Sequence, residues 1–286
     1  MEKINKLALG TVQFGINYGI SNKNGQVSIE EVGRILDYAK ENGINTLDTA
    51  SLYGTSEEVL GQFNLEDFNV VTKTIKINNT LDRQENFEMF KEAFYSSQRK
   101  LGYIELYGLL FHSQDDLLSK NGNELWDLVS DFKEKQYVQK IGVSVYEPEI
   151  LLEIIDKFDI DIVQLPLNIL DQRFVGVLDE LKAKNIEVHT RSTFLQGLLL
   201  MENNEINPYF EEIKPLLAKI PSPKIAYALD FAKNLEQIDK IVLGCTLQKE
   251  LQEIIMMYNK NIEKIDYSGF KVTNQNYINP SLWRFK

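Results

Sequence analysis

The stretch INTLDTASLYGTSEEVL (residues 44–60) joins a short apolar run to a segment with helical spacing. Asp48 closes the apolar run, and Tyr53 follows five positions later, directly before Gly54. The first part, INTLDTA, is typical of a buried strand, and TSEEVLGQF (55–63) is typical of a short helix. A carboxylate and a phenol at the point where a strand gives way to a loop are either turn residues or part of a catalytic site.

The same strand-then-helix unit recurs along the chain. Most of the apolar runs are nearly continuous in Ile, Val and Leu, as expected for parallel strands covered on both faces. They span residues 6–12, 44–50, 69–74, 104–112, 140–145, 161–168, 186–192 and 240–246. Helical spacing marks residues 28–43, 55–63, 84–102, 122–136, 147–158, 174–185, 223–234 and 248–260. Eight alternations predict an α/β fold of the (β/α)8 TIM barrel type, with a doubly wound open sheet as the competing fold.

No linker or change in composition divides the chain. Its 286 residues suit one barrel, which commonly takes about 200 to 250 residues and more with insertions. We therefore expect residues 1–286 to form a single barrel domain. Residues 261–286 lack clear periodicity and are expected to be a C-terminal tail that wraps the barrel or its mouth.

Composition and charge exclude several classes of function. The net charge of -11 and the pI near 4.9 argue against a nucleic-acid surface, which is usually a basic patch. No apolar run is long enough for a signal peptide or a membrane span, so we expect a cytoplasmic protein that does not bind membranes. A single cysteine excludes an internal disulfide and suits a reducing compartment. Two histidines without an HExxH motif make a metal site improbable.

The ends of the expected strands carry the residues with chemistry. Asp48, Lys73 and His112 end the second, third and fourth strands, and active sites of barrels lie at these carboxyl ends. An ammonium beside Tyr53 would lower the phenol pKa from about 10, with Asp48 as the counter-ion of that ammonium. His112 would hydrogen-bond a substrate oxygen. Such a site can give a proton to a carbonyl oxygen while hydride arrives at carbon, or run in reverse.

Each of these residues also has a structural interpretation. Asp48 could be a turn cap, Tyr53 a cover of the barrel rim, Lys73 a solvated edge residue and His112 a satisfied rim histidine. Their coincidence on three consecutive strand ends favours the catalytic interpretation.

Several segments, taken in order, resemble the aldo-keto reductase family. They are LGTVQFG, GINTLDTASLYGTSEEVLG, VVTKT, LLFHS, IGVSV, VQLPLN, FLQGLL and IVLGCT, and they cover the chain from about Leu7 to about Asn259. The resemblance implies a barrel that binds NADP(H) or NAD(H) in extended form without a GxGxxG turn, which this sequence lacks. It also implies a catalytic tetrad in which Tyr53 is the general acid and base; its members are Asp48, Tyr53, Lys73 and His112.

The resemblance further assigns residues to the nicotinamide half of the cofactor. Ser144 and Gln164 match positions that hold the carboxamide. Arg191 stands where the family often has an aromatic ring stacked on the nicotinamide; its guanidinium could stack there or pair with the pyrophosphate. Ser192 and Gly197, in the loop after the seventh strand, match positions along the phosphates.

Residues 244–254 match the adenosine end of the cofactor. The residues assigned to the cofactor here are Gly244, Cys245, Thr246, Lys249 and Glu253. The first three lead into a helix N-terminus, which favours phosphate. Relatives that prefer NADP carry an arginine where this chain has Glu250, and Lys249 is the basic residue nearby. The preference between NADP and NAD is therefore open.

The substrate and the class of function remain less determined. Phe14, Tyr18 and Tyr146 are expected on loops that border an apolar, aromatic pocket for a small carbonyl or alcohol, with a sugar derivative slightly favoured by analogy. One alternative is a barrel of the same family that binds cofactor as a regulatory subunit. Another is a lyase or isomerase that forms a Schiff base on Lys73. The oligomeric state is left open.

Overall fold

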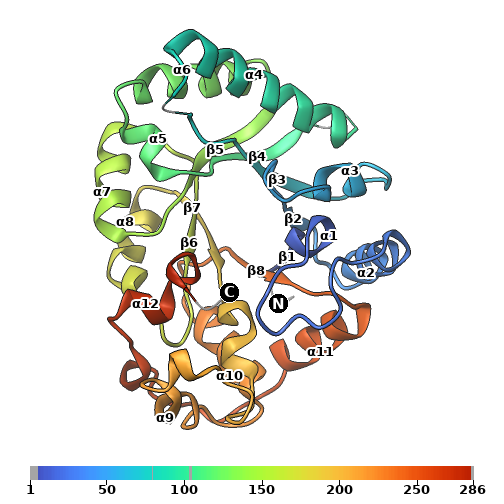
Figure 1. The fold of residues 1–286 in the computed structure, drawn as a ribbon, viewed down its shortest axis with the longest axis vertical. Coiled ribbons are helices and arrows are strands. Elements are labelled where there is room, and N and C mark those ends of the chain that lie inside the picture. The colour runs from blue at the N-terminus through green and yellow to red at the C-terminus, as the bar shows by residue number, and fades with distance from the viewer. Residues whose placement is uncertain (1–5, 79, 103–104, 285–286) are drawn as a thin grey trace.

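The computed structural model describes residues 6–78, 80–102 and 105–284. Eight parallel strands pair in chain order, and the last pairs back with the first, so the sheet closes into a barrel with helices outside it (Figure 1). The predicted (β/α)8 TIM barrel is confirmed, and the open sheet is excluded. The strands are β1 (Leu7–Gly10), β2 (Thr46–Asp48), β3 (Asn69–Lys73), β4 (Leu106–Phe111), β5 (Val138–Ser144), β6 (Ile162–Pro166), β7 (Glu187–Arg191) and β8 (Lys240–Gly244).

Each predicted helical segment contains a helix, and several shorter helices add to them. The α-helices are α1 (Val12–Gly15), α2 (Ile29–Glu41), α3 (Ser56–Leu60), α4 (Arg83–Lys100), α5 (Gln114–Leu118), α6 (Gly122–Glu134), α7 (Pro148–Lys157), α8 (Leu178–Ala183), α9 (Lys214–Leu217), α10 (Lys224–Lys233), α11 (Gln248–Tyr258) and α12 (Gln275–Ile278). The 3-10 helices are η1 (Arg173–Val177), η2 (Leu195–Leu200), η3 (Pro208–Phe210), η4 (Ser268–Phe270) and η5 (Pro280–Leu282). None of the helices in the described part of the chain has the length and apolarity needed to cross a membrane.

Helix α2 shows both the strength and the limit of local signals. The Ser28 side chain accepts a hydrogen bond from the Glu31 backbone N–H, which is the usual role of a serine at the N-cap position. The Glu31 carboxylate does not complete a capping box. It accepts instead from the backbone N–H of Gln248 at 2.7 Å, at the start of α11. The Glu31 side chain therefore joins α2 to α11, although the two helices are far apart in the sequence.

The core lies mainly between the barrel and its ring of helices. Phe94 of α4 stacks on Phe132 of α6 with ring centroids 4.0 Å apart. Inside the barrel, Val71, Leu110 and Ile162 form a separate small cluster. Because strand residues pack on both faces, their runs are continuously apolar instead of alternating.

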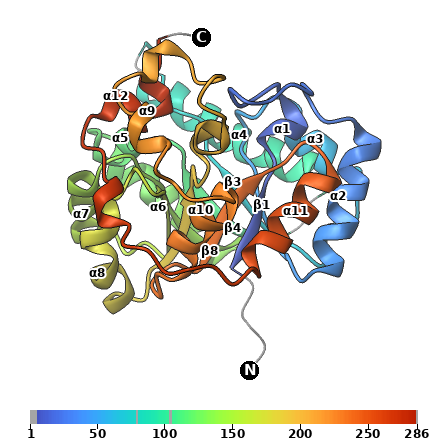
Figure 2. The same cartoon turned by 90° about the horizontal axis from the view of Figure 1, so that it is seen from below.

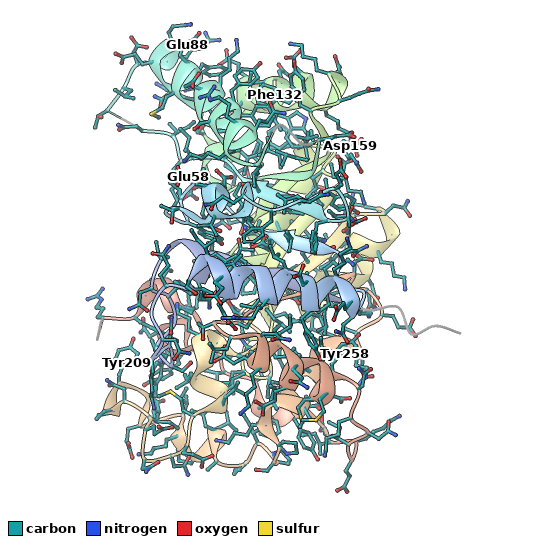
Figure 3. All side chains as sticks on the ribbon, turned by 90° about the vertical axis from the view of Figure 1, so that its right-hand side faces the viewer. Glu58, Glu88, Phe132, Asp159, Tyr209 and Tyr258 are labelled. Atoms are coloured by element: carbon teal, nitrogen blue, oxygen red, sulfur yellow. The ribbon has the colours of Figure 1, made fainter. Side chains whose placement is uncertain are left out.

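The tail after α11 runs along the outside of the barrel. The Val272 N–H donates to the Leu170 carbonyl, and the Tyr267 hydroxyl donates to Asp230. Figure 2 shows α12 near the end of the barrel where α1 and α9 lie. In Figure 3, Tyr209 lies at that end and Tyr258 at the opposite end.

Candidate active site

A tight loop between β2 and α3 positions the Tyr53 side chain. The Tyr53 N–H donates to the Ala50 carbonyl at 3.0 Å, and the Ser56 N–H donates to the Tyr53 carbonyl at 3.1 Å. Gly54 has φ +59°, and a Cβ at this position would lie 2.6 Å from the Gly15 carbonyl oxygen. The glycine after the tyrosine is thus required by a close contact with α1, and this contact fixes the loop.

Asp48 and Lys73 form a buried ion pair beneath that loop. The Lys73 ammonium donates to the two carboxylate oxygens of Asp48 at 2.7 and 2.8 Å and to the Thr49 carbonyl at 2.9 Å. The Gln164 side chain also donates to Asp48, at 2.7 Å. The side chains of the pair are 5% exposed or less. Three acceptors around one ammonium make the pair a fixed support that is neutral overall.

The Tyr53 hydroxyl lies near this pair but contacts it weakly. Lys73 Nζ is 3.5 Å from Tyr53 Oη, the outer limit of a hydrogen bond, and 5.0 Å from the ring centroid. The expectation that the phenol pKa falls below its ordinary value is wrong for this arrangement. Burial raises the pKa of Tyr53 above its ordinary value, and the Asp48 carboxylate raises it further. Because Asp48 neutralises the ammonium, desolvation dominates, and Tyr53 stays protonated at neutral pH.

His112 completes the group from the end of β4. Its ring meets the Tyr53 ring edge-on, with centroids 6.1 Å apart. Burial, and then the Lys73 charge, lowers the pKa of His112 to about 3, so the imidazole is neutral at neutral pH. Its buried Nδ1 makes no hydrogen bond to any described residue. A neutral imidazole with an open nitrogen can hydrogen-bond a substrate oxygen.

The structure brings these four side chains to one cavity. The cavity has a volume of about 840 Å³ and continues from Tyr53 to Glu253 on α11. That volume lies within the range of about 300–1,000 Å³ that is usual for small-molecule and cofactor sites. The mouth of the barrel is therefore hollow on the side where the strand ends carry their polar residues.

Three buried polar atoms that lack a partner among the described residues belong to residues that line the cavity. They are Gln13 Oε1, His112 Nδ1 and Thr193 Oγ1. A buried polar atom without a hydrogen bond costs about 1–3 kcal/mol, so a ligand that bonded these atoms would relieve that cost. A long cavity lined by residues with such atoms fits a dinucleotide. Gln13 and Thr193 were missed from sequence, although each follows a strand end, where functional residues of barrels lie.

The residues expected around the nicotinamide line the same cavity as Tyr53. Ser144 and Gln164 line the cavity from β5 and β6. Arg191, at the end of β7, lines it as well. Its guanidinium donates to the Val145 carbonyl at 3.0 Å and lies 4.2 Å from the Tyr146 ring centroid. Arg191 is thus stacked on an aromatic side chain of this protein.

The loop after β7 has a strained backbone where it lines the cavity. Ser192, Leu195 and Gln196 have φ values of +65°, +48° and +54°, which are uncommon for residues other than glycine. Gly197 has φ +94°, and a Cβ there would lie 1.9 Å from Ser21 Oγ. Ser192 and Gly197, expected near the phosphates, both line the cavity. Close contact with Ser21 explains why the chain needs glycine at 197.

The residues expected at the adenosine end divide into two groups. Gly244, Cys245, Thr246 and Glu253 line the cavity. Lys249, the second residue of α11, is exposed and does not line it. Burial raises the pKa of the Cys245 thiol, which argues against a nucleophilic thiolate.

One expected pocket residue is misplaced. Tyr18 and Tyr146 line the cavity, but Phe14 does not. Phe14 is fully buried in α1 and belongs to the main core. Sequence predicts a loop around Phe14, whereas VQFG forms a helical turn in which the Phe14 side chain packs inward.

Known proteins resemble this chain along most of its length. An uncharacterized oxidoreductase of Bacillus subtilis (strain 168), YqkF, is 24% identical over 94% of this chain and 96% of its own. Oxidoreductase sirO of Leptosphaeria maculans is 28% identical over 48% of this chain and 42% of its own. The holo form of the aldo-keto reductase AKR11C1 from Bacillus halodurans superposes with a TM-score of 0.72, at 19% identity, over 91% of this chain and 89% of its own.

The family model described as "Aldo/keto reductase family" matches residues 6–270. This match covers β1 to β8, the whole cavity and part of the tail. The closed barrel and the oxidoreductases among its relatives agree with it. The chain therefore belongs to the aldo/keto reductase family, whose members are oxidoreductases.

Proposed function

We propose that this protein interconverts a small carbonyl compound and its alcohol with a nicotinamide dinucleotide, and that Tyr53 is the general acid and base. The observation that carries the proposal is the convergence of Tyr53, His112 and the Asp48–Lys73 pair on one cavity. The substrate would be an aldehyde, ketone or sugar derivative. Tyr18 and Tyr146 give its pocket an aromatic wall.

The side chains divide the work at the carbonyl oxygen. Tyr53, protonated at neutral pH, donates its proton to that oxygen, and His112 orients the same oxygen through a hydrogen bond. The phenolate left on Tyr53 is stabilised by the Lys73 ammonium, which Asp48 holds 3.5 Å away. A nicotinamide dinucleotide, when bound in the cavity, would supply the hydride or accept it in the reverse direction. Ser144, Gln164, Arg191, Ser192, Gly197, Gly244, Cys245, Thr246 and Glu253 would hold it.

A Schiff base on Lys73 is less well supported. Burial lowers the pKa of Lys73, which would favour a nucleophilic amine, but Asp48 opposes this shift. All three N–H bonds of the ammonium have acceptors within 2.9 Å. The amine would have to leave these partners to attack a substrate. Borohydride trapping of a carbonyl substrate on Lys73 would favour this second mechanism.

Replacement of Tyr53 by phenylalanine tests the proposal. Loss of a general acid should reduce turnover by about 10²–10⁴-fold, while the affinity for the dinucleotide changes little. Turnover is followed by absorbance at 340 nm with a panel of aldehydes, ketones and sugar derivatives, and affinity by cofactor fluorescence. Tyr107→Phe is the matched control because its hydroxyl donates to Glu187, away from the cavity. Unchanged turnover in Tyr53→Phe would remove this residue from its role. If the wild-type protein binds the cofactor but turns over no member of the panel, a regulatory subunit is favoured instead.

A further inference from the structure

The far end of the cavity, where α11 begins, is lined by carboxylates. Glu250 and Glu253 form part of its wall next to Thr246. These residues are on α11, after β8, whereas the proposed function assigns the nicotinamide to the part of the cavity lined by Tyr53, Ser144 and Gln164. The chemistry at this end therefore bears on the adenosine half of a dinucleotide.

The N–H groups that open α11 already have anionic partners. Glu250 accepts from the Thr246 N–H at 2.6 Å, from the Leu247 N–H at 3.3 Å and from the Thr246 hydroxyl at 3.0 Å. Glu31, from α2, accepts from the Gln248 N–H at 2.7 Å. The N-terminus of a helix normally favours phosphate, because its N–H groups and dipole attract negative charge. Here two carboxylates of the protein occupy three successive N–H groups.

Basic side chains do not offset these carboxylates inside the cavity. Arg34 binds Glu31 at 2.7 Å, but from the outer surface of α2. Among the described residues that line the cavity, the cationic side chains are Lys23, Lys73 and Arg191. Lys23 pairs with Glu205 at 3.3 Å, and the other two lie beside Tyr53. A dianionic 2'-phosphate near Thr246 would meet Glu250 and Glu253, the carboxylates that line this part of the cavity, without an arginine fork.

We infer that Glu250, supported by Glu31, makes the protein select NAD(H) over NADP(H). This inference rests on the proposed function, since it assumes that the cavity binds a nicotinamide dinucleotide with its adenosine half at α11. A ribose hydroxyl can donate a hydrogen bond to a carboxylate, whereas a phosphate at the same carbon is repelled by it. Like-charge contacts in an interface cost several kcal/mol, so NADH should bind about 100-fold more tightly than NADPH.

The test measures the affinities for NADH and NADPH by cofactor fluorescence. Calorimetry of ADP-ribose and its 2'-phosphate makes the same comparison with redox-inactive probes. Wild-type protein should favour the form without the 2'-phosphate in both pairs. Glu250→Gln keeps an acceptor oxygen but removes the charge. It should reduce the ratio of the NADPH to the NADH dissociation constant at least about tenfold, mainly through tighter NADPH binding. Adding Glu31→Gln should reduce it further. Glu30→Gln is the matched control, because Glu30 binds only Arg34 among these residues.

The outcomes separate the two proposals. Equal or tighter binding of NADPH by the wild-type protein would overturn the inference and leave the proposed function standing. A ratio that Glu250→Gln does not change would likewise show that this carboxylate does not select the cofactor. Absence of binding by either dinucleotide would overturn both. Because the wild-type ratio is measured first, a variant that fails to fold does not prevent a decision.

Discussion

The Lys73 ammonium contacts three strong acceptors and, at 3.5 Å, the phenol of Tyr53. Lys73→Met should therefore abolish turnover and also destabilise the fold, since Asp48 would remain buried without its counter-ion. Removal of one partner from a buried ion pair costs about 3–5 kcal/mol. Urea denaturation followed by circular dichroism would measure the loss.

A second variant separates charge burial from catalysis. In the double variant Asp48→Asn, Lys73→Met, no unpaired charge remains, so much of the lost stability should return while turnover stays absent. If the double variant is as unstable as Lys73→Met alone, the instability comes from lost packing around the lysine stem, and the account of a buried uncompensated carboxylate is wrong.

Sequence predicts where the tetrad residues lie better than it predicts their protonation. Asp48, Lys73 and His112 each stand at the end of a strand, so barrel closure alone brings them to one mouth. The shift of the Tyr53 pKa depends on burial and on Asp48 neutralising Lys73, and neither is encoded locally. Spacing in the sequence reports which residues meet, whereas the balance of desolvation and charge requires the packed structure.

Strand β7 carries a second polar cluster at its opposite end. The Glu187 carboxylate accepts from the Tyr107 hydroxyl at 2.6 Å, hydrogen-bonds His189 at 2.6 Å and pairs with Lys140. Burial disfavours the ionised carboxylate, but these hydrogen bonds prevail and lower the pKa of Glu187 to about 2. His189 thus belongs to a buried cluster that joins β4, β5 and β7.

This cluster predicts a pH-dependent contribution to stability. A folded pKa below the ordinary value of 4.5 stabilises the fold above that pH, and the contribution is lost as the pH falls towards 2. Glu187→Gln should therefore cost about 2 kcal/mol near pH 7, after allowance for partial solvent exposure, and progressively less below pH 4.5. Urea midpoints measured from pH 2.5 to 7 test this. Glu153→Gln, in an exposed pair with Lys157, should cost less than about 0.5 kcal/mol at every pH. A cost for Glu187→Gln that does not vary with pH would contradict the assignment.

Elements were predicted where periodicity extends over several turns and missed where it does not. The segment 28–43 contains α2 with its Ser28 cap, because the signals there are local. The segment 174–185 divides into η1 and α8, and VQFG forms a turn that buries Phe14. Helices of four to six residues gain most of their stability from tertiary packing, so their sequences carry little periodicity.

The whole chain has a net charge of -11, yet the charges in its cavity are unevenly placed. Arg191 and the Asp48–Lys73 pair lie beside Tyr53, while Glu250 and Glu253 lie at the far end. Net charge from sequence describes solubility and partners in general. It does not predict this separation, because the place of each charge in the cavity depends on which strand ends and helices meet there.

The tail contributes to the stability of the molecule without lining its cavity. Trp283 is 5% exposed, and its ring centroid lies 5.0 Å from that of Phe210. None of the described tail residues lines the cavity.

Trp283→Ala should therefore destabilise the fold by about 3 kcal/mol or more, because it removes a large buried ring, while the affinity for the dinucleotide at a permissive temperature stays within about twofold. Far-UV circular dichroism reports unfolding, and cofactor fluorescence reports binding. Leu282→Ala, at an exposed neighbour, should have little effect on either. Weaker cofactor binding by folded Trp283→Ala would instead place the tail in contact with the site.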